Sequence, residues 1–134
     1  MNSISLDTVN QLRDFNCTGM PEERKVVAAE EALDLRFSTD YLEITKKYGA
    51  ISFYGHHFTG ISPFPGNNVV KVTIEQRSYN PQVPKDFYVI EEAHIDGIIV
   101  WQNSRGNVFQ TYPNGQPLLL SSDLYDYIAQ LIII

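Results

Sequence analysis

The chain has 134 residues, of which 43% are hydrophobic, 12% are aromatic and 19% are charged, with a formal net charge of −6. A chain of this size buries on the order of two thirds of the surface that its unfolded form exposes, which excludes intrinsic disorder and predicts a single domain over residues 1–134. Acids outnumber bases by seven to three over residues 1–35 and by six to one over residues 86–134, so these segments would repel phosphate backbones, which argues against direct nucleic-acid binding.

The sequence also indicates where in the cell the protein is expected and which kinds of covalent and metal site it can form. No secretory leader is recognised at its start, and no apolar run approaches the roughly twenty residues that span a bilayer. Cys17 is the one cysteine, so neither an intrachain disulfide nor a cysteine-rich zinc site can form, and we expect a small buried thiol. We therefore expect a cytoplasmic protein with no cofactor, no metal and no membrane association.

Apolar residues at helical spacing predict two helices in the first 35 residues. Leu6, Val9 and Leu12 recur every three residues and predict a short helix, with Phe15 continuing the series. Pro21 suits the first position of a second helix, which we place at residues 21–34. The buried face of this second helix is expected to be Val26, Ala29 and Leu33.

A third helix is predicted after a short extended connector. Asp40 and Glu43 form a possible capping pair at its start. Lys46 and Lys47 would offset the exposed carbonyls of its last turn, and Gly49 can adopt the left-handed conformation that ends a helix. The expected core face of this helix is Tyr41, Ile44 and Tyr48.

From residue 50 the apolar period changes to two, which predicts strands. The clearest alternation is that of Val70, Val72 and Ile74 with polar neighbours, which is typical of a strand with one buried face. The other predicted strands cover residues 50–54, 57–61, 87–92, 98–102, 108–112 and 117–120.

The turns between the later strands indicate antiparallel pairing, because they contain residues that tolerate positive φ. These turns are Asp96–Gly97, Asn103–Asn107 with its Gly106, and Asn114–Gly115. The unbroken apolar run Ile98–Trp101 predicts a central strand covered on both faces.

A last helix is expected with Leu124, Ile128 and Leu131 on one side and a cap from Ser121 or Ser122. Helices, then antiparallel strands, then a closing helix is the order of an α+β fold. We predict N-terminal helices, a mainly antiparallel curved sheet of about six strands and a closing C-terminal helix.

No catalytic or metal-binding constellation is predicted. His56 and His57 are adjacent, so on a strand they point to opposite faces and cannot easily share a metal ion. His94 lies near several acids, but a solvated hairpin end is favoured over an acid–base site because nothing nearby supplies a nucleophile or an oxyanion donor. The glycines stand singly between strands and form no phosphate loop.

Core packing rather than ligand contact is the expected role of five aromatic residues. They are Tyr41, Tyr48, Phe53, Trp101 and Phe109. A small acidic domain without a catalytic constellation favours binding over turnover, while an enzyme acting on a small ligand in a sheet pocket stays a less favoured hypothesis.

Two segments resemble the SUKH superfamily, which includes fungal cell-wall-assembly regulators and many bacterial immunity proteins. They are LRFSTDYLEITKKYGAISFYGHHFTG, from Leu35 to Gly60, and FYVIEEAHIDGIIVWQNSRGNVFQTYPNG, from Phe87 to Gly115. Within the superfamily, the sequence looks closest to YobK-like immunity proteins. The matching positions are structural ones, namely Tyr41, Tyr48, Gly49, Phe53, Gly55, Gly97 and Trp101.

This resemblance implies an immunity protein, or antitoxin, that binds and neutralises the toxic C-terminal domain of a cognate LXG-type polymorphic toxin. The resemblance also implies that this domain is a nuclease, either an RNase or a DNase. The alternative is a regulatory scaffold without catalytic activity that binds signalling or cell-wall-related proteins.

The partner-binding surface is expected on an uncovered face or edge of the sheet. Glu91, Glu92 and Asp96 should surround an accessible acidic area, because an unpaired carboxylate is costly to bury. Ordinary surface solubility is the alternative explanation of these acids. The aromatic anchors expected beside them are Tyr54, Tyr88 and Tyr112.

Overall fold

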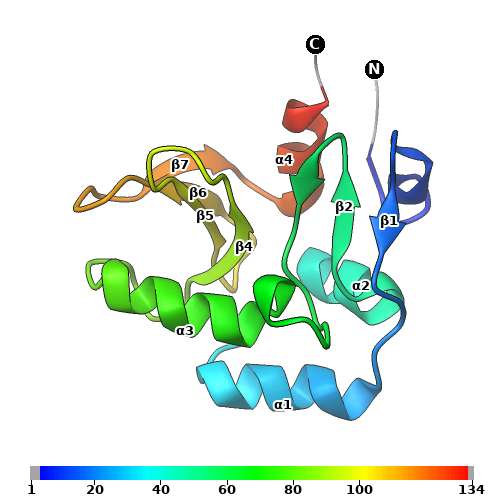
Figure 1. The fold of residues 1–134 in the computed structure, drawn as a ribbon, viewed down its shortest axis with the longest axis horizontal. Helices are drawn as coiled ribbons and strands as arrows, with labels where there is room; N and C mark the ends of the chain where they lie inside the picture. Colours follow the sequence, from blue (N-terminus) through cyan, green and yellow to red (C-terminus); the bar gives the residue numbers. More distant parts are fainter. Residues whose placement is uncertain (1–3, 133–134) are drawn as a thin grey trace.

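A computed structural model describes residues 4–132, which form four α-helices and two antiparallel sheets (Figure 1). The predicted α+β fold with a closing helix is confirmed. The helices are α1 (Glu23–Leu33), α2 (Thr39–Tyr48), α3 (Val69–Tyr79) and α4 (Leu124–Leu131). The strands are β1 (Asn16–Cys17), β2 (Ile51–Phe53), β3 (His56–His57), β4 (Tyr88–Glu92), β5 (Ile99–Gln102), β6 (Val108–Thr111) and β7 (Leu118–Ser121).

The prediction of a helix near the start of the chain is wrong. Only the 3₁₀ turn η1 (Val9–Gln11) forms there, with Val9 fully buried. A spacing of three residues also fits the three residues per turn of a 3₁₀ helix, so the apolar pattern could not distinguish a single turn from an α-helix.

Helices α1 and α2 form as predicted, with small differences at their starts. The buried faces are the expected ones. Helix α1 begins at Glu23, so Pro21 lies two residues before it. Ser38 is the N-cap residue of α2, and Asp40 does not cap the helix with Glu43 as predicted; its carboxylate contacts other elements instead. Gly49 ends α2 with φ of 78°.

The strand predicted from Val70, Val72 and Ile74 is a helix. Its N-cap, Asn68, accepts hydrogen bonds from the backbone N–H groups of Val70 (3.0 Å) and Lys71 (3.2 Å). Tertiary packing then buries a helical face of Val69, Val72 and Thr73, and leaves Ile74 exposed. The intrinsic strand preference of valine and isoleucine yields to a strong cap and to this packing.

The predicted single sheet is divided into two sheets, one of three strands and one of four. Strand β3 ends at His57. The residues that follow it add no strand to the larger sheet and contact β4 through a bridge between Phe58 and Glu91 and through hydrogen bonds from Thr59. The four later strands lie where they were predicted, to within one residue at most boundaries, and they pair in antiparallel order β4-β5-β6-β7. Positive φ occurs at the expected turn residues Asp96, Gly97, Gly106 and Asn114.

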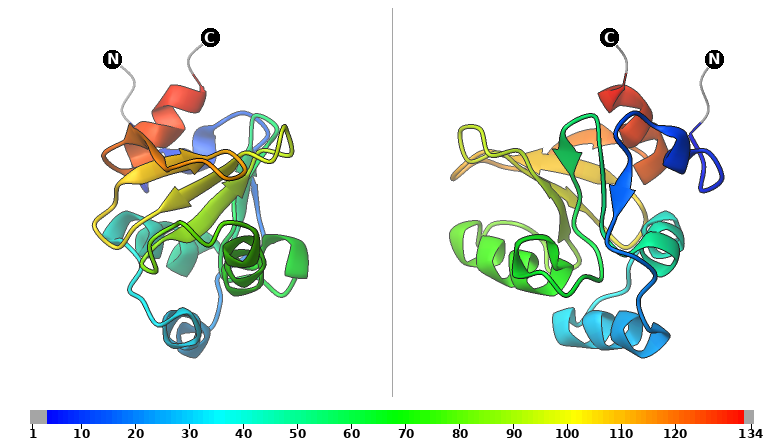
Figure 2. Two further views of the ribbon diagram at one scale, coloured as in Figure 1. Left: turned by 90° about the vertical axis from the view of Figure 1, so that its left-hand side faces the viewer. Right: turned by 45° about the vertical axis from the view of Figure 1, so that its right-hand side comes forward.

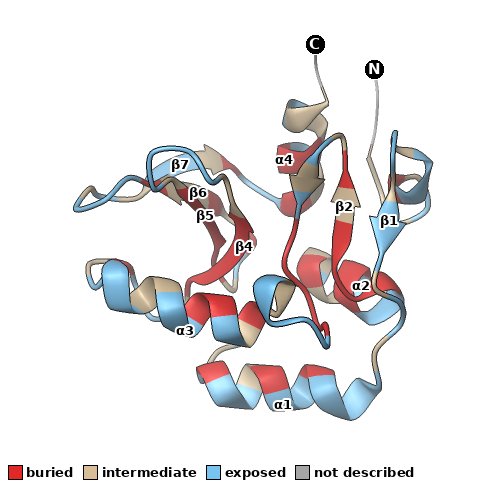
Figure 3. Ribbon diagram, in the orientation of Figure 1, coloured by how far each residue is buried: buried red, intermediate tan, exposed pale blue. Residues whose placement is uncertain are grey.

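The central strands of the larger sheet are covered on both faces. On one face Val72 of α3 packs with Val89, Ile99 and Trp101. On the other face the larger core cluster contains residues of α2 and α4 together with strand residues such as Val100. Figure 2 shows α3 on one side of this sheet and α4 on the other. Every residue of β5 is buried, as the apolar run predicted (Figure 3).

Helix α4 begins with a different cap from the two predicted serines. Asp123 is its N-cap, and its carboxylate accepts a hydrogen bond from the backbone N–H of Asp126 at 2.7 Å. None of the helices within residues 4–132 is long and apolar enough to cross a membrane.

The seven positions that match the superfamily fall into two groups. Four are buried aromatic residues, and three are glycines with positive φ. The aromatic residues are Tyr41, Tyr48, Phe53 and Trp101, and the glycines are Gly49, Gly55 and Gly97.

Candidate functional site

Two turns at one end of the four-stranded sheet form an exposed surface that is acidic and apolar. The β4–β5 turn contacts the β6–β7 turn, since a Cβ atom placed on Gly97 would lie 2.8 Å from Cγ of Pro113. Exposed apolar side chains on these turns include Ile95 (62% exposed) and Tyr112 (48%). We call this surface the turn surface and define it as Glu92, Ile95, Asp96, Tyr112 and Pro113.

The turn surface contains three of the six residues predicted to bind a partner. Glu92 pairs with Ile99, which pairs in turn with Thr111, so the end of β4 and the start of the β6–β7 turn lie at the same end of the sheet. Asp96 is exposed, whereas Glu92 is half-buried and accepts a hydrogen bond from Gln76 Nε2 of α3 at 2.8 Å. The three predicted residues on the turn surface are Glu92, Asp96 and Tyr112.

Glu91 is not accessible, which contradicts the prediction. It is 5% exposed, its Oε2 atom lies 2.6 Å from Nδ1 of His56, and its Oε1 atom accepts a hydrogen bond from the Tyr127 hydroxyl at 2.8 Å. A register shift between Val89 and Glu91 changes the alternation in β4. Both carboxylate oxygens therefore have a partner, and the cost of burying them is offset.

We call Glu91, His56 and Tyr127 the Glu91 clasp. These residues come from β4, β3 and α4, so the clasp connects the two sheets and the closing helix. Burial raises the pKa of the Tyr127 hydroxyl well above its ordinary value, and the nearby Glu91 charge raises it further. The phenol therefore stays protonated and donates to the carboxylate, which is the role of a structural contact.

Tyr88 and Tyr54 do not lie beside the turn surface as predicted. Tyr88 is fully buried, and its hydroxyl accepts a hydrogen bond from the Ser38 backbone N–H and donates to Gln102 Oε1 at 2.7 Å. Tyr54 follows β2 in the smaller sheet, where the Arg13 guanidinium lies 4.3 Å from the centre of its ring. Tyr88 is therefore a core residue, and Tyr54 belongs to a different surface.

Cys17 is exposed in β1, which contradicts the expected buried thiol. Strand β1 has only two residues, and both of them are exposed. Strand β3 presents His56 half-buried and His57 exposed. Among the described residues, no group of three or more His, Cys, Asp and Glu side chains is arranged to hold a metal ion.

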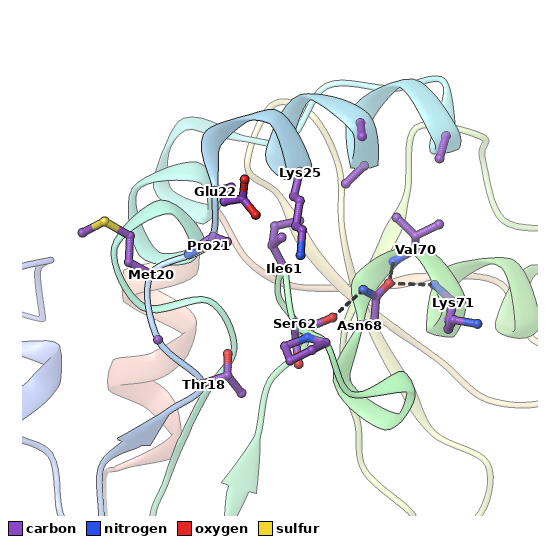
Figure 4. Close-up of a pocket in the computed structure, with 15 residues that line it drawn as sticks. Thr18, Met20, Pro21, Glu22, Lys25, Ile61, Ser62, Asn68, Val70 and Lys71 are labelled. Atoms are coloured by element: carbon purple, nitrogen blue, oxygen red, sulfur yellow. Dashed lines mark hydrogen bonds between the residues drawn. The ribbon is translucent and has the colours of Figure 1, made fainter.

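A groove of about 620 Å³ lies between α1 and the start of α3, and the sequence did not predict it (Figure 4). The small side chains of Ala28, Ala29 and Ala32 leave room along α1, and this is the one sequence signal that could have indicated it. Asn68 on its wall is already bonded, since it donates to Ser62 O at 2.8 Å and caps α3. The remaining lining residues contain lysines and one glutamate but no pair of a nucleophile and a base.

The order of elements and the antiparallel sheet with helices on both of its faces place the protein among the α+β domains. The family model described as SMI1-KNR4 cell-wall, SUKH_6, matches residues 23–128, which is more than three quarters of the chain. The chain belongs to this family, as the resemblance indicated. A comparison with curated proteins finds no match.

Proposed function

We propose that this protein is a cytoplasmic immunity protein that binds and neutralises the toxic C-terminal domain of a cognate LXG-type polymorphic toxin, and that this domain is a nuclease. The proposed mechanism is occupation of the toxin domain by a partner without catalytic activity of its own. The observation that carries the proposal is the turn surface, which exposes an aromatic and an aliphatic side chain next to carboxylates at one end of the sheet. Family membership supports the same role.

The charge of the protein suits a basic partner. A nuclease must attract phosphate groups and therefore tends to present positive charge at its active site. The formal net charge of −6 would accelerate the encounter with such a domain, and Glu92 and Asp96 would meet its cations at the contact. Steering of this kind weakens as salt screens the charges.

The turn surface has the composition of an interface with apolar anchors and a polar rim. In the proposed complex Tyr112 and Ile95 fill the centre, where aromatic residues carry most of the binding free energy. Glu92 and Asp96 lie at the rim. Glu91 acts indirectly, since the Glu91 clasp fixes the strand that leads into the turn. A standard interface buries about 1,600 Å² in total, so residues beyond the two turns must also take part.

Co-expression with the toxin domain encoded beside the gene tests the proposal. We expect the wild-type chain to restore growth, and we expect the purified chain to form a stoichiometric complex with a catalytically inactive form of that domain. Tyr112→Ala should weaken the complex by at least about tenfold, which corresponds to about 1.4 kcal/mol. The double variant Glu92→Lys/Asp96→Lys should mainly slow association.

The matched control reverses two charges elsewhere. Glu23→Lys/Glu31→Lys changes the net charge by the same amount, but both residues are exposed on α1, away from the turn surface. This control variant should still restore growth, and only the acceleration of association by the overall negative charge should be lost. A wild-type chain that neither binds the toxin domain nor restores growth would contradict the proposed function.

The description of the matching family as a cell-wall family favours a second candidate function. In this alternative the protein is a regulatory scaffold, and the turn surface binds a signalling or cell-wall-related protein. The two candidates differ in the partner, so a toxin domain that this chain neutralises supports the first one only.

A further inference from the structure

The two outer edges of the four-stranded sheet differ in how their backbone groups are hydrogen-bonded. Strand β4 forms one edge, and residues outside the sheet form hydrogen bonds with its outward-facing backbone groups. Thr59 donates from its backbone N–H to Ile90 O at 2.9 Å and from its hydroxyl to Val89 O at 2.6 Å. The Thr73 hydroxyl of α3 accepts a hydrogen bond from Val89 N at 3.0 Å.

Strand β7 forms the other edge, and it is open. Outside its ladder with β6, the one hydrogen bond to its backbone within the described residues is that from Gln130 Nε2 to Leu120 O, at 3.2 Å. Leu118 is 56% exposed and Leu119 is 57% exposed. Because consecutive strand residues point to opposite faces, the start of β7 is uncovered on both faces and along its outer side (Figure 3).

Proteins usually blunt such an edge with lysines or with proline. Here no Lys, Arg or His occurs from Gly106 to Ile132, and the acids that follow β7, Asp123 and Asp126, are exposed. Pro117 lacks an N–H group and limits the available ladder to the few residues from Leu118 onward. The edge is therefore short and apolar, and the two charged residues that follow it most closely in the sequence are both acids.

We propose that the edge of β7 accepts an extended basic segment of the partner protein as a fifth strand of the sheet. In this arrangement backbone hydrogen bonds supply affinity, apolar side chains of the segment contact Leu118 and Leu119, and its lysines or arginines face Asp123 and Asp126. A basic segment fits better than a second copy of this chain, because two copies would bring two acidic edges together. The identity of the partner rests on the proposed function.

Amide hydrogen exchange, read residue by residue by NMR, tests the inference. The first probe is the catalytically inactive toxin domain, and the second is a synthetic octapeptide of alternating lysine and valine. We expect the amides of residues 118–121 that face outward to exchange at least about tenfold more slowly with either probe, and to be unaffected by an octapeptide of alternating glutamate and valine. Protection by both peptides or by neither overturns the inference.

Variants add a second readout. Leu118→Lys/Leu119→Lys places cations on an exposed edge without opening the core, and it should weaken binding of the toxin domain by at least about tenfold. Ile74→Lys is the control, because Ile74 is 55% exposed but lies on α3; it should change the affinity less than about twofold.

The outcomes separate this inference from the proposed function. A tight toxin complex that the double variant leaves unchanged, with no protection of residues 118–121, overturns the inference and leaves the proposed function standing. Absence of any toxin complex contradicts the proposed function, and the lysine–valine peptide then decides the inference alone. Protection of β7 that grows with protein concentration, together with dimers in sedimentation, identifies a second copy as the occupant and overturns the inference.

Discussion

The Nδ1 atom of His56 lies 2.6 Å from Oε2 of Glu91, although the two residues are 35 positions apart in the chain. The contact joins the last strand of the smaller sheet to the first strand of the larger one. Tyr127 of α4 binds the second oxygen of the same carboxylate. A buried carboxylate is costly unless it is hydrogen-bonded, so the three elements stabilise one another only in this arrangement.

Loss of either partner of Glu91 should destabilise the protein. We expect Tyr127→Phe to lower the free energy of unfolding by about 1.5–3 kcal/mol, because it removes a hydrogen bond to a charged group and retains the ring. His56→Ala should have an effect of similar size. Urea unfolding followed by circular dichroism measures both changes.

Two further variants test whether the clasp acts as a unit. His57→Ala alters the exposed neighbour of His56 and should change the free energy of unfolding by less than about 0.5 kcal/mol. The double variant His56→Ala/Tyr127→Phe should depart from additivity by more than about 0.5 kcal/mol. Strict additivity would show that the two contacts stabilise the fold independently.

Asp40 connects three parts of the fold, and Asp40→Ala should be strongly destabilising. Its carboxylate accepts hydrogen bonds from Tyr41 N (2.7 Å), Leu124 N (2.8 Å) and Gln102 Nε2 (3.0 Å). We expect a loss of about 2–3 kcal/mol, since donors that are mostly buried lose their acceptor. Amide exchange should accelerate most in the first turn of α4.

Glu43→Ala provides the comparison for Asp40. Glu43 is exposed on the same helix and accepts one hydrogen bond, from the Tyr125 hydroxyl at 2.7 Å. Its replacement should cost less than about 1 kcal/mol. Equal losses for the two variants would mean that the network around Asp40 adds nothing to the general effect of truncating a side chain on α2.

Gly60→Ala should prevent normal folding, while Gly66→Ala should be tolerated. A Cβ atom on Gly60 would collide with the carbonyl of Gly49 and lie 2.8 Å from Cα of Ala50, so backbone would have to move. The expected cost is about 3 kcal/mol or more. A Cβ atom on Gly66 meets nothing within 4 Å. Thermal unfolding of both variants tests this, and a Gly60→Ala protein as stable as Gly66→Ala would contradict the close approach.

The protein should lose stability as the pH rises above about 10. Burial raises the pKa values of Tyr41, Tyr88 and Tyr127 above the ordinary value of about 10, so the folded state holds these protons more tightly than the unfolded state. Below pH 10 both states are protonated and the stability is unaffected. Above pH 10 the unfolded state releases protons that the folded state keeps, and unfolding becomes more favourable.

Each buried tyrosine should contribute a slope of up to about 1.4 kcal/mol per pH unit in this range. Urea titrations between pH 9 and pH 11.5, together with tyrosinate absorbance, measure the slope and the protons released. Tyr127→Phe should lower the number of protons released on unfolding by up to one, which reduces the slope by up to about 1.4 kcal/mol per pH unit. A stability that does not change up to pH 11.5 would contradict the burial of these hydroxyls.

Local sequence patterns were sufficient to predict much of the fold. The apolar spacing of Val26, Ala29 and Leu33 predicted α1, and the run Ile98–Trp101 predicted a covered central strand. The strand predicted from the alternation of Val70, Val72 and Ile74 was wrong, because the apolar residues of so short a segment fit both the strand period and the helix period. The cap from Asn68 and the packing of α3 favoured the helix.

The sequence by itself determined the fold class, the antiparallel order of the later strands and the acidic character of the chain. These follow from periodicity, turn residues and charge, which act over a few neighbouring positions. Only the tertiary structure decided that Glu92, Asp96 and Tyr112 share a surface while Glu91 and Tyr88 are buried. That outcome depends on which distant elements cover each side of a strand, and adjacent residues such as Glu91 and Glu92 differ in exposure because His56 and Tyr127 lie over one of them.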